Sequence, residues 1–347
     1  MSALSCSSIR TERVLACPLC GSPDRNVLCY GLDRAYQASD QVFQFVRCRR
    51  CRGCYQSLRP IEDDVHKLYP DSYAPYQVAN SAIPPLTGES PGAPAQVRSR
   101  LMRKSLGLLG CIAEKLNGAL RAWTPDPLPA VLSLVYKPRA AGQTLLDFGC
   151  GSEHFLNQAR TLGWNTLGVD FVESVVARVR AVGHAGFLIT PQLWSAIPDG
   201  SLDLVRLNHV VEHLYDPQQT LTALKRKLKP GGLLHLATPN AASLTFALLR
   251  HRWFALEPRH IILYSPCTAR RLLRRVGFRH VRTYQEVLTK DAARSIGFWL
   301  QDLGKATYQE ALTMPHRPRL NQLLYAPARL AALLGVSDRF HAVARVG

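Results

Sequence analysis

The sequence has no long apolar segment. No stretch of the 347 residues approaches the roughly 20 consecutive apolar residues that a membrane-spanning helix requires. The first 15 residues, MSALSCSSIRTERVL, also lack the apolar run of a secretory signal, so we expect a cytoplasmic protein. Hydrophobic residues make up 47% of the chain and charged residues 20%, a balance that excludes a disordered protein and predicts a packed core.

Acidic residues are scarce relative to basic ones. The chain contains 25 Asp and Glu against 43 Lys and Arg, which gives a formal net charge of +18. A basic surface attracts nucleic acid, anionic lipid headgroups and substrates that carry phosphates. The arginines are spread along the chain and form no single block, so the charge alone does not select a partner.

Composition divides the chain into regions. We expect a small module in residues 1–75 and a larger domain in residues 136–347, which contains a helical insertion at 288–336. Residues 76–135 combine a linker rich in Pro, Gly and Ser with a basic amphipathic helix at 97–123. We expect the apolar face of this helix to pack on the larger domain, with peripheral membrane contact as the alternative.

The larger domain shows a regular alternation from Thr144 onward. Short apolar runs such as TLLDFG and NTLGVD alternate with segments of helical periodicity of about 10 to 15 residues. This pattern indicates βαβ units. It predicts an α/β fold with a doubly wound parallel sheet and helices on both faces.

A glycine-rich turn follows the first predicted strand. In Asp147-Phe-Gly149-Cys-Gly151, the glycines let the backbone turn tightly and approach a ligand at the start of a helix. The next strand ends at Asp170, 19 residues after Gly151. An acid there can accept hydrogen bonds from both ribose hydroxyls of a cofactor that contains adenosine. These residues alone would suit a dinucleotide equally well.

The order of the downstream segments distinguishes a dinucleotide from another cofactor that contains adenosine. LLDFGCG, GVD, IPDGSLDLVRLNHVVEHLYDP, LKPGGLLHLATPN and WFALEPRHIILYSPCTARRLLRRVGF follow one another across residues 143–281. This region resembles the class I methyltransferases, which use S-adenosylmethionine (SAM) and have a Rossmann-like sheet. An NAD-dependent enzyme is the weaker alternative, because the chain lacks a third glycine and the matching downstream motifs. The resemblance implies cofactor binding by Asp147, Gly149, Gly151, Asp170, Leu193, Asn208 and His209.

Position 153 departs from the family pattern. Glu153 stands where these methyltransferases usually carry a third small residue. A carboxylate here could repel the carboxylate of SAM. At a helix N-terminus, however, an acid also interacts favourably with the helix dipole, and we expect Glu153 to turn outward.

Histidines and a glutamate follow the fourth predicted strand. His209, Glu212 and His213 are spaced i, i+3 and i+4, so a helix would place all three on one face. His209, His213 or the separate His260 could act as a general base, because histidine titrates near neutral pH. The cluster could instead hold a divalent cation, as in similar quinone-ring methyltransferases, although these carry a carboxylate at the position of His209. A structural role is the third interpretation.

Two C-x2-C pairs near the N-terminus predict a metal site. The pairs are separated by 27 residues, and four thiolates predict a structural Zn(II) ion bound by Cys17, Cys20, Cys48 and Cys51. From spacing alone, Cys54 could replace Cys48. The segment resembles the zinc ribbons that precede methyltransferases of this type, and this resemblance favours Cys48 and Cys51. It also implies that the ribbon covers the active site and contacts substrate through Tyr69, Tyr73 and Tyr76.

Together these features predict a SAM-dependent methyltransferase. We expect transfer to a hydroxyl, or to a sugar carbon, of a small-molecule or a sugar- or nucleotide-linked acceptor, which the basic surface allows to be anionic. The alternative is a nucleic-acid-binding zinc ribbon joined to a degenerate SAM fold. We expect no nucleic-acid partner, because the ribbon lacks the interleaved aromatic residues of a stacking platform. The sequence does not indicate an oligomeric state.

Overall fold

The structure is a computed structural model of the 347-residue chain and describes residues 9–69, 117 and 126–347. The amphipathic helix expected at residues 97–123 and the linker before it lie almost entirely outside the described residues, as do Tyr73 and Tyr76. Among the helices of the described part, none combines the length and apolar character that crossing a bilayer requires.

A seven-stranded sheet forms the centre of the larger domain, in the order β12-β13-β10-β9-β6-β7-β8. The five strands from β10 to β8 are parallel, whereas β13 is antiparallel to both of its neighbours. The predicted α/β fold is confirmed, and the antiparallel strand is an addition to the expected parallel sheet. The strands are β6 (Thr144–Phe148), β7 (Asn165–Asp170), β8 (Ala185–Leu188), β9 (Leu202–Asn208), β10 (Leu228–Pro239), β12 (Phe278–Glu286) and β13 (Arg339–Val346).

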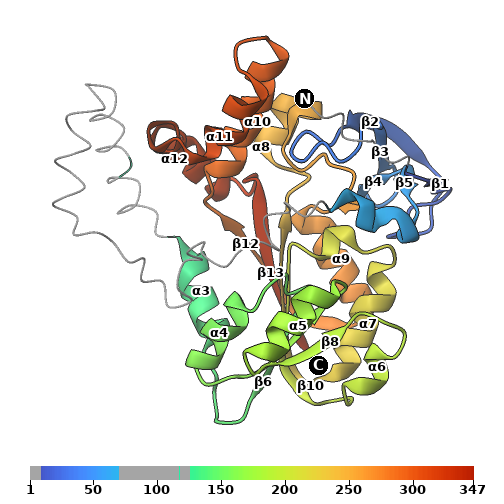
Figure 1. Ribbon diagram of the computed structural model, residues 1–347, viewed down its shortest axis with the longest axis vertical. Coiled ribbons are helices and arrows are strands. Elements are labelled where there is room, and N and C mark those ends of the chain that lie inside the picture. The colour runs from blue at the N-terminus through green and yellow to red at the C-terminus, as the bar shows by residue number, and fades with distance from the viewer. Residues whose placement is uncertain (1–8, 70–116, 118–125) are drawn as a thin grey trace.

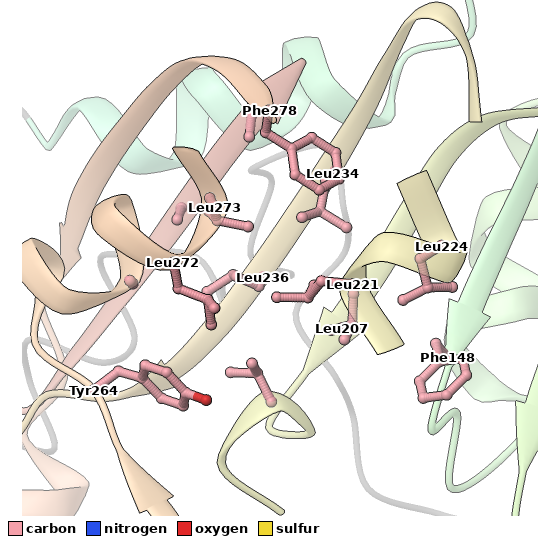
Figure 2. Close-up of a cluster of buried hydrophobic side chains, with 14 of the residues drawn as sticks. Phe148, Leu207, Leu221, Leu224, Leu234, Leu236, Tyr264, Leu272, Leu273 and Phe278 are labelled. Atoms are coloured by element: carbon pink, nitrogen blue, oxygen red, sulfur yellow. The ribbon is translucent and has the colours of Figure 1, made fainter. Parts of the chain in front are cut away.

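Helices cover both faces of this sheet, because apolar residues fill consecutive strand positions. Leu145 and Leu204 belong to a cluster with residues of α3 and α4, whereas their neighbours Leu146 and Val205 belong to a larger cluster with α7 and α9. Figure 2 shows leucines of α7 and α9 in the larger cluster. The covering helices are α3 (Pro127–Tyr136), α4 (His154–Thr161), α5 (Glu173–Ala181), α6 (Leu193–Ala196), α7 (Pro217–Lys227) and α9 (Pro266–Val276).

Residues with short polar side chains cap the N-termini of α7 and α9, the helices that pack beside Leu146 and Val205. The Asp216 side chain accepts a hydrogen bond from the Gln219 backbone N–H at 2.9 Å, just before Pro217 opens α7. Ser265 and Thr268 form a capping box at the start of α9, and Gly277 ends that helix with φ 92°.

The N-terminal module forms a second sheet, which also takes a strand from the larger domain. Its order is β11-β4-β3-β2, and Ile262 of β11 pairs with Tyr55 of β4. Strand hydrogen bonds therefore join the module to the larger domain across the division expected near residue 75. The elements are β1 (Thr11–Arg13), β2 (Arg25–Gly31), β3 (Phe43–Cys48), β4 (Cys54–Gln56), β5 (Leu58–Pro60), the 3-10 helix η1 (Glu62–Leu68) and β11 (Ile262–Leu263).

Helices between β12 and β13 form the expected insertion and contact the module. Arg34 Nη1 lies 2.7 Å from Asp302 Oδ1, and the Tyr308 hydroxyl donates to the Ala35 carbonyl at 3.0 Å. Figure 1 shows the module and the insertion at the same end of the large sheet. The remaining helices are α8 (Leu244–Leu249), α10 (Lys290–Asp302), α11 (Tyr308–Thr313) and α12 (Pro318–Leu333), with the 3-10 turns η2 (Val211–His213), η3 (Arg250–Arg252) and η4 (Met314–His316).

Candidate active site

A cavity of about 800 Å3 opens at the carboxyl ends of the parallel strands. This edge is where open α/β sheets bind ligands. The cavity is lined by the glycine turn, by side chains at the ends of β7 and β9, by Tyr36 and Tyr69 of the module and by Arg294 of α10. A more open hollow of about 1030 Å3 lies near Arg59 and Tyr215, but neither the glycine turn nor a histidine lines it. The enclosed cavity is therefore the candidate active site.

The glycine turn and Asp170 form one hydrogen-bonded unit. Gly149 and Gly151 have φ of 71° and 64°, and a Cβ on Gly149 would lie 2.5 Å from Val210 Cγ2. The Asp170 carboxylate accepts from the backbone N–H of Gly151 at 2.8 Å and of Val172 at 3.1 Å. Burial raises the pKa of Asp170, while these backbone donors oppose that change. The turn and the acid are thus held together beside the cavity.

Two predicted cofactor residues do not line the cavity. Asp147 is fully buried, and both of its carboxylate oxygens lie 2.8 Å from Nη1 of Arg206, which does line the cavity. Leu193 is 2% exposed and belongs to the hydrophobic core, whereas its neighbour Trp194 lines the cavity and stacks on Phe148 at 6.0 Å. Direct contact of Asp147 and Leu193 with a cofactor stays a prediction, and an indirect role fits these positions better.

Aromatic and apolar residues that the sequence reasoning missed complete this part of the cavity. Phe171 follows Asp170 directly and is 42% exposed, and Ile189 lies just after β8. The Phe171 ring meets the Tyr69 ring at 5.4 Å in an edge-on arrangement. An aromatic residue immediately after Asp170 was the available sequence signal.

Glu153 does not line the cavity. Its Oε2 lies 3.8 Å from Arg178 Nε on α5, while the neighbouring Ser152 does line the cavity. The carboxylate therefore points toward α5, as expected for an acid that turns away from the cofactor.

The segment after β9 is not a continuous helix, so the expected common face of His209 and His213 is wrong. Strand β9 ends at Asn208, His209 has a left-handed φ of 56°, and only Val211–His213 form a 3-10 turn. The backbone reversal at His209 sends its ring toward β13, where its Nε2 lies 2.8 Å from Arg339 Nη1.

Both ring nitrogens of His209 are occupied. A guanidinium only donates, so Nε2 must accept from Arg339, and the proton on Nδ1 faces Glu212 Oε1 at 3.2 Å. Burial and the nearby Arg339 lower the pKa of His209. Both Asn208 and His209 line the cavity, as predicted for cofactor contacts, but the geometry of His209 does not suit a general base.

Glu212 is a buried carboxylate held by two donors. It is 0% exposed and accepts hydrogen bonds from His209 and from the Thr238 hydroxyl at 3.0 Å. Burial opposes its ionisation, but the His209 hydrogen bond and the nearby histidines lower the pKa of Glu212 to about 2. The carboxylate is therefore ionised at neutral pH.

His213 and His260 lie side by side with their rings 5.0 Å apart. The Nδ1 atoms lie 2.8 Å from the carbonyls of Arg259 and Ala255, respectively. A carbonyl only accepts, so each Nδ1 carries a proton. On His213 the neutral ring therefore keeps its lone pair on Nε2. Burial, with His260 beside it, lowers the pKa of His213 to about 4.

Glu257 distinguishes His260 from His213. Its Oε1 lies 3.2 Å from His260 Nε2, and both residues line the cavity. A carboxylate and a carbonyl only accept, so both ring nitrogens of His260 face acceptors and neither offers a free lone pair, as in His209. Among the three histidines, His213 has the geometry that best fits a general base, because its Nε2 has no hydrogen-bond partner in the described part of the chain and the residue lines the cavity.

The predicted cation site takes a different form in the structure. Ligand atoms of Glu212, His213 and His260 lie within 4.8 Å of one another, so His260 would replace His209 as the third ligand. Cation binding here stays a prediction.

The four predicted cysteines converge. Cys17 and Cys51 Sγ lie 3.5 Å apart, and Cys20 and Cys48 Sγ lie 3.6 Å apart. Zn–S bonds of about 2.3 Å in a tetrahedron require sulfur–sulfur distances of about 3.8 Å, so the donor set fits Zn(II). Cys54 instead packs in the apolar cluster around Trp253, which excludes it as an alternative ligand.

A buried arginine joins the module to the His260 segment. Arg259 is 0% exposed and donates to Asp33 Oδ1 at 3.2 Å, to Glu257 Oε2 at 2.6 Å and to the Leu68 carbonyl at 2.7 Å. Its guanidinium also lies 4.5 Å from the centre of the Tyr36 ring. Sequence reasoning missed Asp33, Glu257 and Arg259, because no local pattern links Asp33 to two residues that lie more than 200 positions further along the chain.

Residues 120–283 match the family model of a methyltransferase domain. A probable S-adenosylmethionine-dependent methyltransferase from Mycolicibacterium smegmatis is 32% identical over 146 residues, which cover 40% of this chain and 53% of that protein. A ubiquinone biosynthesis O-methyltransferase from Xanthomonas oryzae pv. oryzae is 32% identical over 114 residues, which cover 31% of this chain and 48% of that protein. The chain thus spans about half the length of these curated relatives, and residues 120–283 are similar to a methyltransferase domain.

Solved structures also match the chain. A SAM-dependent methyltransferase from Archaeoglobus fulgidus matches with a TM-score of 0.41 and 20% identity, over 67% of this chain and 94% of that protein.

Proposed function

We propose that this protein is a SAM-dependent methyltransferase. The observation that carries the proposal is the unit formed by the Gly149–Gly151 turn and Asp170, which shares one cavity with His213 and the His260–Glu257 pair. The matched methyltransferase domain supports the same activity.

The residues present fit SAM. Asp170 is placed to accept hydrogen bonds from the ribose hydroxyls, and the glycine turn permits close approach of the methionine part. Phe171, Ile189 and Trp194 offer an apolar surface for the adenine. When bound, SAM supplies a methyl group already activated on a sulfonium sulfur, so the protein mainly has to orient the acceptor and exclude water.

The acceptor is a hydroxyl, or a sugar carbon, of a small molecule. His213 Nε2 takes the proton that the acceptor releases, because the Arg259 carbonyl fixes the other ring nitrogen as a donor. Glu257, held by Arg259, fixes the neighbouring His260 ring. The O-methyltransferase among the relatives supports a hydroxyl acceptor.

The module closes this site and binds one structural zinc ion through Cys17, Cys20, Cys48 and Cys51. The fit of the four sulfur atoms supports this assignment. The Cys48–Cys51 turn of the module contacts α9, where Arg271 donates a hydrogen bond to the Cys51 carbonyl at 3.1 Å. We further propose a division at residues 1–75, 76–135 and 136–347, and a cytoplasmic location.

Calorimetric titration with SAM and with S-adenosylhomocysteine tests the proposal. We expect binding by the wild type and at least about tenfold weaker binding by Asp170→Asn, which loses the charged acceptor for the ribose hydroxyls. Asp199→Asn, at an exposed carboxylate, is the matched control and should bind as the wild type does. The absence of detectable binding by the wild type would exclude the proposed function and favour a degenerate fold.

A further inference from the structure

Three arginines line the candidate active site, and they differ in their partners. Arg206 is paired with Asp147 at 2.8 Å, and Arg339 is paired with both oxygens of Asp291. Arg294 lines the same cavity and is half-buried, yet it has no ion-pair or hydrogen-bond partner within residues 9–69, 117 and 126–347. Its positive charge is the one in this lining that no carboxylate of the described chain neutralises.

The fold places Arg294 near Arg339. Asp291 lies one helical turn before Arg294 on α10, and its carboxylate reaches Arg339 on β13. The next residue, Ser295, accepts a hydrogen bond from the Phe254 backbone N–H at 3.0 Å, and the Arg339 guanidinium lies 5.7 Å from the Phe254 ring. Both guanidinium groups and the Phe254 ring line the cavity, on segments that contact one another.

The acidic residues of the lining are committed elsewhere or lie on other elements. Asp170 binds the glycine turn, Asp216 caps α7, and Glu257 is paired with Arg259. Glu62 is an exposed residue of η1. Placing a guanidinium in a half-buried position without a counter-charge costs free energy, and a negatively charged ligand group would offset that cost.

We propose that Arg294, beside Arg339, binds an oxyanion of the methyl acceptor, a phosphate or a carboxylate. This inference rests on the proposed function and defines its acceptor as an anionic molecule. The planar guanidinium of arginine matches both groups through two parallel hydrogen bonds. Because Arg294 belongs to the insertion and the cofactor residues belong to the sheet, Arg294 contributes to acceptor binding and not to SAM binding.

The test uses the full chain saturated with S-adenosylhomocysteine, titrated separately with inorganic phosphate and with acetate at ionic strength held constant with potassium chloride. We expect at least one anion to bind the wild type, and Arg294→Gln to weaken that binding by at least about tenfold. Arg294→Lys should retain part of it. Arg319→Gln removes an exposed arginine of the same insertion and should bind as the wild type does. The stronger anion identifies the group as phosphate or carboxylate.

Two results would overturn the inference: no anion binding by the wild type, or equal binding by the wild type and Arg294→Gln. Unchanged affinity of Arg294→Gln for S-adenosylhomocysteine shows that the variant is folded, and a parallel loss of that affinity would contradict the separate acceptor role. If the wild type fails to bind S-adenosylhomocysteine, the proposed function is excluded. The anion titrations can still be made in the absence of S-adenosylhomocysteine, so the two failures are distinguishable.

Discussion

The two sides of the candidate active site are built in different ways. On the cofactor side, Gly151 and Asp170 are 19 residues apart and meet because β6 and β7 are adjacent parallel strands. On the acceptor side, Asp33 and Arg259 meet across more than 200 residues, and Arg34 meets Asp302 across a still longer separation. The cofactor side therefore depends on one βαβ unit, whereas the acceptor side requires the module and the insertion to be docked.

The interactions on the two sides also differ in kind. Backbone N–H groups hold Asp170, but buried charged side chains hold the acceptor side together around Arg259. A buried ion pair is sensitive to the loss of one partner, because the remaining charge stays buried without compensation. The acceptor side should thus be easier to disrupt without damage to the cofactor side.

Removing the zinc site should have the largest effect. We expect Cys48→Ser to contain less than stoichiometric zinc, and β2 to β4 to lose protection in amide hydrogen exchange, because structural zinc sites contribute on the order of 10 kcal/mol to folding. Amides of β6 and β7 should stay protected. Cys267→Ser, at an exposed cysteine, is the control for thiol loss. Equal loss of protection in both sheets would show that the two sides are not separable.

The general base gives the next prediction. His213→Ala should lower the rate of labelled methyl transfer from SAM by roughly 10²- to 10⁴-fold, the usual range for loss of a general base. Affinity for S-adenosylhomocysteine should not change. The assay uses hydroxyl-bearing acceptors from a screen of phenols and sugars, and His316→Ala, at an exposed histidine, is the control. A larger effect of His260→Ala or His209→Ala would assign the base to that residue instead.

Loss of Arg259 should destabilise the acceptor side. Arg259→Ala leaves the carboxylates of Asp33 and Glu257 buried without their partner, and we expect a loss of about 3 to 5 kcal/mol in the free energy of unfolding. Urea denaturation measures this loss. Arg226→Ala breaks an exposed ion pair with Asp199 and should change stability little. Similar losses in the two variants would contradict the importance of burial.

The smallest effect is expected on the cofactor side, at Glu153. Because its carboxylate lies toward Arg178 and outside the cavity lining, Glu153→Gly should change SAM affinity by less than about twofold, well below one hydrogen bond to a charged group. Calorimetry measures this change. A marked gain in affinity would show that Glu153 does repel the cofactor.

Sites built from residues close in sequence could be predicted, whereas contacts between distant segments that pack together could not. The glycine turn, Asp170 and the four cysteines follow from short spacings, and the structure brings each group together. The prediction named Leu193, whereas its neighbour Trp194 lines the cavity, because the orientation of α6 decides which of the two side chains faces it. The common face of His209 and His213 failed because one residue with positive φ reverses the backbone.

The sequence by itself determined the α/β sheet, the glycine turn after β6 and the thiolate donor set. Each of these depends on periodicity or on residues within one structural unit, which local backbone physics governs. Only the tertiary structure decided that β11 completes the sheet of the module, that Glu257 and Arg259 orient His260, and that Arg294 faces the cavity with no counter-charge among the described residues. Such contacts depend on how distant segments pack, and no spacing along the chain records that arrangement.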